Sequence, residues 1–225
     1  MTFLLSSITP VIIFLFLVYH RDHINVPIKL LIYCFLGGFL AYFSAFIFEL
    51  IGMIFINQIS NHFLNTFGRS FLNAALPEEL AKFSILYLII WKKNSFDHYY
   101  SGIIYAVFVS LGLALIENIT YLYQHGLNIA VTRAVLAVPM HGFCAVIMGY
   151  YFSKAKFGTP EERRKYLRKS FFIPIIFHGS YDFPLMYLRI TDDPLLLFFL
   201  IIFFAITVIE FWRLGIKDIK LLTNR

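Results

Sequence analysis

The chain alternates long apolar stretches with short polar connections. Seven of the stretches come close to the roughly 20 residues that a helix needs to cross a bilayer. They cover residues 3–19, 30–56, 68–91, 101–124, 128–152, 170–189 and 194–213. The first has neither a basic start nor a small-residue cleavage signal after it, so we expect it to be retained as a span. The pattern therefore predicts an all-α, polytopic membrane protein with about seven transmembrane helices.

The composition supports this class of protein. Of the 225 residues, 60% are hydrophobic and 14% are charged, whereas a soluble domain carries about a quarter charged residues. The net charge of +6 comes from residues scattered between apolar stretches, so we expect no nucleic-acid partner. Cys34 and Cys144 lie inside such stretches and cannot form a disulfide framework. We expect one integral membrane domain over residues 1–225, surrounded by the lipid bilayer.

The basic residues predict the orientation of the chain, because lysine and arginine accumulate on the cytoplasmic side of a membrane. Alternate connections hold fifteen of the 19: Arg21 and Lys29; Lys92 and Lys93; the seven from Lys154 to Lys169; and Arg213, Lys217, Lys220 and Arg225. The opposite connections hold only Arg69, Arg133 and Arg189. The sequence therefore predicts a multi-pass protein of the cell membrane with an extracytoplasmic N-terminus and a cytoplasmic C-terminus.

The longest connection contains a helix start. Thr159 can act as the N-cap, Pro160 suits the first helical position, and Glu162 can complete a capping box. Five basic residues follow between 163 and 169. We expect a short basic helix that lies against anionic headgroups.

Several polar residues lie inside the predicted third to sixth spans. A charged side chain at bilayer depth costs roughly 2.5–3.5 kcal/mol on insertion scales, so such residues usually line a cavity or a site. In chain order they are Glu78, Glu79, Lys82, Glu117, Asn118, Arg133, His141, His178 and Asp182. At a rise of about 1.5 Å per residue, Glu78, Glu117 and the two histidines fall within about 10 Å of one depth, in the outer half of the membrane. These four helices are therefore expected to form one polar site.

Two further glutamates stand apart from this group. Glu49 lies in the second stretch with no motif around it, and we expect a structural hydrogen bond there. Glu210 lies three residues before Arg213 near the cytoplasmic end of the last stretch, which favours an interfacial ion pair.

The spacing within each helix indicates how the site is organised. Glu78 and Lys82 are four residues apart and share a face, so the ammonium can keep a glutamate ionised. His178 and Asp182 have the same spacing, and the aspartate can orient the imidazole. Pro77 cannot donate a backbone hydrogen bond, which favours a kink or a helix start just before the glutamates. Neighbouring side chains on a helix point about 100° apart, so we expect one glutamate to face the site and the other to support it.

Two chemistries suit these residues, and the residues alone leave both open. One is a zinc centre with two histidines and a glutamate as ligands and an open position for water. The other is metal-free, with a glutamate as base and His178 and Asp182 stabilising the oxyanion. The candidate metal ligands are Glu79, Glu117, His141 and His178. The candidate catalytic residues are Glu78, Glu79, His178 and Asp182.

Four ordered motifs resemble those of the PrsW family of intramembrane proteases, which are relatives of the CAAX-protease and bacteriocin-processing (CPBP) group. They are Glu78-Glu79-x-x-Lys82, Glu117-Asn118, His141 with Gly149 and an upstream Arg133, and His178-x-x-x-Asp182. In the second motif, Leu113 replaces the phenylalanine that leads the family's pattern. The resemblance covers a core of about residues 68–190.

The resemblance implies a membrane-embedded endopeptidase, usually classed as a metallopeptidase, that acts on a membrane-bound protein substrate. The best-known role of the family is the first, extracytoplasmic cut in an anti-sigma factor, and the outer-half depth of the polar residues fits such a cut. A processing protease for prenyl proteins or peptide pheromones would need a site that opens to the cytoplasm. The alternative from another class is a scaffold or an ion- or proton-coupled transporter. No matched pair of interrupted helices is evident in the sequence to support a transporter.

Overall fold

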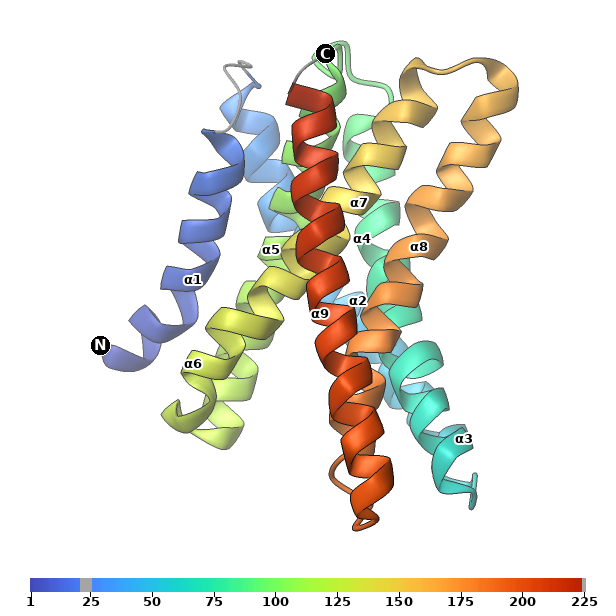
Figure 1. The fold of residues 1–225 in the computed structure, drawn as a ribbon. Helices are drawn as coiled ribbons and strands as arrows, with labels where there is room; N and C mark the ends of the chain where they lie inside the picture. Colours follow the sequence, from blue (N-terminus) through green and yellow to red (C-terminus); the bar gives the residue numbers. More distant parts are fainter. Residues whose placement is uncertain (21–25, 224–225) are drawn as a thin grey trace.

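The computed structural model is helical throughout the residues that it describes, which are 1–20 and 26–223, with side chains up to residue 217 (Figure 1). The long helices are α1 (Thr2–Tyr19), α2 (Ile28–Ile56), α4 (Leu76–Ile90), α5 (Tyr99–His125), α7 (Val138–Phe157), α8 (Pro160–Tyr187) and α9 (Pro194–Thr223). The short segments are α3 (His62–Phe67), η1 (Gly68–Ala75), η2 (Leu127–Ile129), α6 (Ala130–Thr132) and η3 (Arg133–Ala137).

The described helices form seven rods that run up and down through one bundle (Figure 1). Five rods are long and apolar enough to cross a membrane, and they span Thr2–Tyr19, Ile28–Ile56, Tyr99–His125, Leu127–Phe157 and Pro194–Lys217. The other two are α3–η1–α4 and α8, which carry charges of the predicted site and, in α8, a basic first half. The all-α membrane architecture is confirmed. The polar and charged side chains of α3–η1–α4 and α8 make these two rods less apolar than the other five.

Two rods change from α-helical to π-helical geometry for a short distance. The segments η1 and η3 are both π-helical, and each leads into a helix with proline at its second position, Pro77 in α4 and Pro139 in α7. Proline leaves one backbone carbonyl of the preceding turn without its donor, and the wider π turn accommodates that loss. The irregularity near Pro77 was expected from the sequence, whereas the matching one near Pro139 was not.

The start of α8 differs from the sequence-based expectation. Only Gly158 and Thr159 separate α7 from α8, and the basic residues form the first turns of the continuous helix Pro160–Tyr187. The expected separate surface helix is therefore wrong, although the capping box between Thr159 and Glu162 is present. The Glu161 backbone N–H and the Thr159 hydroxyl hold the pKa of the Glu161 carboxyl below its ordinary value, which fits a carboxylate at a helix N-terminus.

Helix α5 lies at the centre of the bundle, between α2 and α7, and most of its residues up to Ala114 are buried. Pairs of glycines allow the close crossings. A Cβ on Gly149 of α7 would lie only 2.5 Å from the carbonyl oxygen of Gly102 in α5. A Cβ on Gly38 of α2 would likewise collide with the backbone of Val109 and Gly112 in α5. Small residues thus let three backbones approach closely, as in other membrane bundles.

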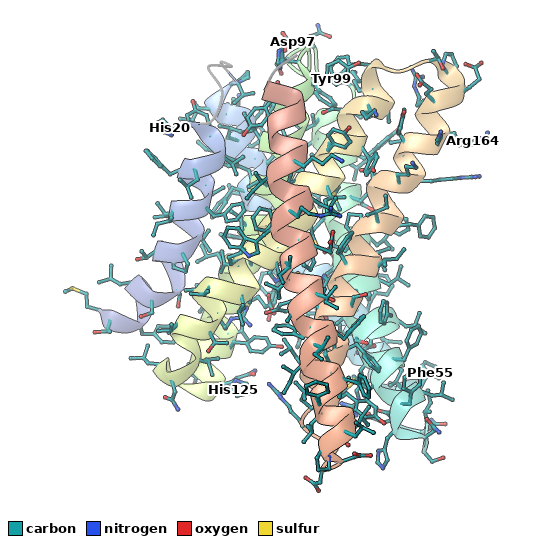
Figure 2. The ribbon with its side chains drawn as sticks, viewed as in Figure 1. His20, Phe55, Asp97, Tyr99, His125 and Arg164 are labelled. Atoms are coloured by element: carbon teal, nitrogen blue, oxygen red, sulfur yellow. The ribbon has the colours of Figure 1, made fainter. Side chains whose placement is uncertain are left out.

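The two ends of the bundle differ in the side chains that they carry. His20, Asp97 and Arg164 lie at the end of the bundle where α9 ends, and Phe55 and His125 lie at the opposite end (Figures 1 and 2). The basic connection between α7 and α8 belongs to the C-terminal end. Arg21, Arg225 and the side chain of Lys220, which the orientation argument also used, lie outside the described residues.

The crossing of α5 and α7 predicts a stability effect. Gly149→Ala places a methyl group against the Gly102 carbonyl, and overpacking of this kind costs about 1–3 kcal/mol of unfolding free energy. Gly68→Ala is the matched control, because a Cβ there comes no closer than 3.5 Å to the Ile56 side chain. Denaturation of both variants in detergent measures the difference. Equal stability of the two variants would contradict the close crossing.

Candidate functional site

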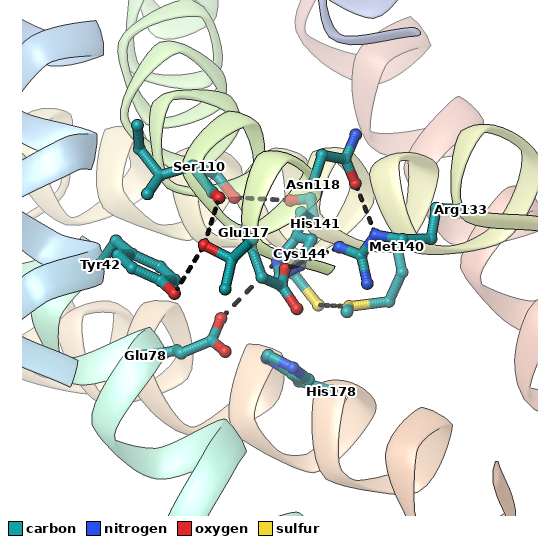
Figure 3. Close-up of polar contacts among 12 residues, drawn as sticks. Tyr42, Glu78, Ser110, Glu117, Asn118, Arg133, Met140, His141, Cys144 and His178 are labelled. Atoms are coloured by element: carbon teal, nitrogen blue, oxygen red, sulfur yellow. Dashed lines mark hydrogen bonds and ion pairs between the residues drawn. The ribbon is translucent and has the colours of Figure 1, made fainter. Parts of the chain in front are cut away.

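The polar residues of four rods meet inside the bundle (Figure 3). Helix α4 supplies Glu78, Glu79 and Lys82; α5 supplies Glu117 and Asn118; η3 and α7 supply Arg133 and His141; and α8 supplies His178 and Asp182. Of these, Glu79 is 0% exposed, Lys82 and His141 are 1% exposed, and His178 is 2% exposed. The structure therefore brings together all the candidate catalytic and metal-binding residues that the sequence indicated.

The prolines and π turns determine where the first and third motifs lie. Glu78 and Glu79 follow Pro77 directly in the first turn of α4, and His141 lies in the first turn of α7, two residues after Pro139. Each motif thus begins where its rod returns from π-helical to α-helical geometry. Such local irregularities are frequent at functional sites.

Lys82 is the central cation of the site. Its Nζ donates to Glu79 Oε1 at 2.9 Å and to Glu78 Oε2 at 3.2 Å. It also lies 3.0 Å from His141 Nδ1. Both adjacent glutamates therefore converge on one ammonium, although their positions on the helix suggested that only one would face the site. The long side chains bend far enough to offset the 100° between them.

The contacts of His141 determine its tautomer. An ammonium has only protons to donate, so His141 Nδ1 must accept from Lys82 at 3.0 Å. His141 Nε2 then carries the proton and donates to Glu117 Oε2 at 2.6 Å. The carboxylate behind the ring orients the imidazole, as carboxylates do behind metal-binding histidines.

Arg133 holds Glu117 in this position. Its Nη2 lies 3.2 Å from Glu117 Oε2, and its Nε donates to Asn118 Oδ1 at 2.7 Å. Asn118 in turn donates to the backbone carbonyl of Ser7 in α1 at 3.3 Å. The guanidinium also lies 4.2 Å from the centre of the Tyr121 ring, a cation–π distance. This network connects α1, α5 and η3 to the histidine of α7.

His178 has a carboxylate on each side of its ring. Its Nδ1 lies 2.9 Å from Glu79 Oε1, whereas its Nε2 lies 3.3 Å from Asp182 Oδ2. Asp182 is the more exposed carboxylate, with 18% of its side chain accessible compared with 0% for Glu79. The longer contact to the more exposed partner leaves Nε2 as the nitrogen that is more easily freed. The rings of His141 and His178 are 5.4 Å apart.

The site can accommodate a divalent metal. Glu78, His141 and His178 each offer one ligand atom, and the three atoms lie within 4.8 Å of one another. One oxygen and two nitrogens are a ligand set found in zinc hydrolases. In addition, Glu79 Oε2 is buried and has no hydrogen-bond partner, although buried polar atoms are normally satisfied. The carboxylate of this group is Glu78, whereas the sequence indicated Glu79 or Glu117 as the oxygen ligand.

Sequence reasoning missed some of the supporting residues. Ser110 of α5 donates to the backbone carbonyl of His141 at 2.9 Å, and the carbonyl of Ser7 accepts from Asn118. Serines are common in apolar helices, so neither residue gave a signal. Pro139 could have been found, because it precedes His141 as Pro77 precedes Glu78.

A groove of about 530 Å³ between α1, α6–α7 and α9 is mainly apolar and contains no residue of the polar cluster.

Comparison with known proteins identifies relatives of the chain. The sequence profile described as "PrsW family intramembrane metalloprotease" matches residues 26–209. The chain is 36% identical over 181 residues to "Protease PrsW" of Bacillus subtilis (strain 168), which covers 80% of this chain and 81% of that protein. It is 37% identical over 188 residues to "Protease PrsW" of Oceanobacillus iheyensis, which covers 82% and 83% of the two chains.

A third relative matches over a shorter segment. "Protease PrsW" of Geobacillus kaustophilus is 45% identical over 119 residues, which are 53% of this chain and 52% of that protein. No solved structure is significantly similar to the chain. The profile extends over most of the chain and two of the relatives align over about four fifths of both lengths, so the chain belongs to the PrsW family of intramembrane metalloproteases.

Proposed function

We propose that this protein is a metal-dependent endopeptidase that cuts a membrane-bound protein substrate near the extracytoplasmic face of the cell membrane. The observation that carries the proposal is the buried convergence of Glu78, His141 and His178, whose ligand atoms lie within 4.8 Å of one another. Residues 1–225 act as one membrane domain in which α4, α5, α7 and α8 hold the site.

The metal ligands in this proposal would be Glu78, His141 and His178, and the metal would replace the contact of His141 Nδ1 with Lys82. When bound, zinc would supply Lewis-acid chemistry by polarising the scissile carbonyl and acidifying water. Glu117 orients His141 through its 2.6 Å hydrogen bond, and Glu79 orients His178 through its 2.9 Å contact. Asp182 lies beside Nε2 of His178 and forms the more exposed wall of the site.

Glu79 is the proposed base. Lys82 and His178 anchor its Oε1, whereas Oε2 is buried and uncommitted. A carboxylate held by one oxygen has its second oxygen free to take a proton from the attacking water, which is what a general base requires. Lys82 stays bonded to both glutamates and neutralises part of their charge throughout.

The position of the site supports an extracytoplasmic cut. Glu117 lies nearer to His125, where α5 ends, than to Tyr99, where it begins. His178 likewise lies nearer to the end of α8 than to its start. Both observations support a site that is nearer to the end of the bundle that is poor in basic residues. If the basic end faces the cytoplasm, the N-terminus is extracytoplasmic and the C-terminus cytoplasmic. An anti-sigma factor with a single span is a substrate that fits this arrangement.

One observation favours a second candidate function, a transporter or a silent scaffold. The rods α3–η1–α4 and α6–η3–α7 are both interrupted beside the polar cluster, and interrupted helices are a feature of transporters. The purified protein can be reconstituted in liposomes to test this function. Cation or proton flux that disappears in the Glu78→Gln variant would support a transporter and count against the protease.

The proposed protease function predicts a loss of cleavage when single residues of the site are replaced. Glu78→Gln, Glu79→Gln, His141→Ala and His178→Ala each remove a ligand or the base, so we expect cleavage to fall by about 10²-fold or more. A panel of tagged single-span membrane proteins, co-expressed with each variant, provides the readout on blots. Glu210→Gln is the control, because Glu210 pairs with Arg213 away from the site. Cleavage that persists in all four variants would refute the site.

The proposed ligands also predict the metal content, which can be measured without a substrate. Purified protein should contain about one zinc per chain, and His141→Ala and His178→Ala should each lose it. Glu79→Gln should retain most of the metal, because Glu79 acts as base and orients a ligand. Elemental analysis by mass spectrometry measures all four proteins. Equal zinc in the two histidine variants and the parent protein would contradict this ligand set.

A further inference from the structure

Helix α2 presents one face to the bundle. The positions on that face recur every three or four residues, with one gap of seven between Ala45 and Gly52, and they are Cys34, Gly38, Ala41, Ala45, Gly52 and Ile56. Ala41 and Ala45 are 0% and 1% exposed. Glu49 belongs to the same series, since it comes four residues after Ala45 and three before Gly52, so it lies on the inward face. Its neighbours Phe48 and Leu50 are 59% and 55% exposed and point away from the bundle.

Contacts above and below Glu49 place it beside the catalytic cluster. A Cβ on Gly52 would collide with the side-chain oxygen of Asn73 in η1, the segment that leads into Glu78. Tyr42 donates to the Thr120 hydroxyl in α5 at 3.1 Å, one turn beyond Glu117. Within the bundle, Glu78, Glu117, His178 and Asp182 are close enough for their charges to act on the Glu49 carboxyl. Glu49 therefore faces the site from a fifth helix.

The Glu49 carboxyl has no partner among the described residues, where no hydrogen bond or ion pair involves it. The structural hydrogen bond expected from the sequence is therefore not found in this part of the chain. A carboxyl that lies inside a membrane bundle, has no hydrogen-bond partner and is close to three other carboxylates is most stable in its neutral form. A neutral carboxyl beside a hydrolytic site holds a proton that it can donate.

We propose that Glu49 is the acid of the hydrolysis and protonates the leaving amine. Glu79 Oε2 takes a proton from water as the hydroxyl oxygen bonds to the carbonyl carbon. Glu49 gives its proton to the amide nitrogen as the C–N bond breaks, so that a carboxylic acid and a neutral amine form. The proton held by Glu79 then returns to Glu49 through water, which restores both carboxyls. This inference rests on the proposed protease function.

The substitution Glu49→Gln tests the role, because it preserves size and hydrogen bonding but removes the transferable proton. With a reporter that the wild-type protein cleaves, we expect kcat to fall by about 10²-fold. KM and zinc content should change little, since Glu49 is not a proposed ligand. Glu49→Asp should recover part of the loss, which a purely structural role would not require. Glu210→Gln again serves as control. Wild-type kcat in Glu49→Gln would overturn the proposal.

A second measurement covers the case in which Glu49→Gln does not fold. Dicyclohexylcarbodiimide is an apolar reagent that reacts with protonated carboxyls in membranes, so it should form an adduct on Glu49 of the wild-type protein and stop cleavage. Peptide mapping by mass spectrometry identifies the modified residue. No adduct on Glu49, or full cleavage by protein that carries it, would overturn the proposal.

The two proposals fail in distinguishable ways. If Glu78→Gln abolishes cleavage while Glu49→Gln cleaves normally, the protease site stands and the role of Glu49 is wrong. If Glu78→Gln, Glu79→Gln, His141→Ala and His178→Ala all cleave normally as well, the protease site itself is wrong.

Discussion

The buried ammonium of Lys82 is the interaction on which the site depends. It is 1% exposed, and its three nearest partners are Glu78, Glu79 and His141, all within 3.2 Å. Three acceptors satisfy the three protons of an ammonium. Without this cation, two adjacent carboxylates would lie inside the membrane with no compensating charge in contact, which is strongly unfavourable. The glutamate pair can therefore exist at this depth only because Lys82 follows it in the same helix.

The same principle recurs around the two histidines. Glu117 supports the imidazole of His141, and Arg133 balances the charge of Glu117. Glu79 supports the imidazole of His178, and Lys82 balances the charge of Glu79. Each histidine is thus oriented by a carboxylate that is itself paired with a cation. The arrangement stabilises the buried charges and fixes the orientation of both rings, so the same contacts that stabilise the bundle also position the candidate ligands.

Much of the fold and of the site could be predicted from the sequence. The rods follow from hydropathy, because a helix is the structure that satisfies its own backbone in lipid. The four-helix site follows from the cost of polar groups in apolar stretches, and Glu78, His141 and His178 were identified in that way. The α7–α8 region was predicted less well. A basic amphiphilic segment can lie on a membrane or extend a span, and only the two-residue connection at Gly158 and Thr159 shows that it extends α8.

By itself, the sequence determined that the chain is a helical membrane protein, which residues are too polar for the bilayer, and which of them share a helix face. Those properties depend on composition and on the period of the helix, which are local. Only the tertiary structure decided that both glutamates reach Lys82, that Glu117 and Glu79 lie behind different histidines, and that Glu49 faces the same cluster from α2. These facts depend on how closely and at what rotation the helices cross. Those crossings depend on glycine contacts, such as that of Gly102 with Gly149, and on the π turns before Pro77 and Pro139. The periodic pattern of apolar residues in the sequence does not reveal these features.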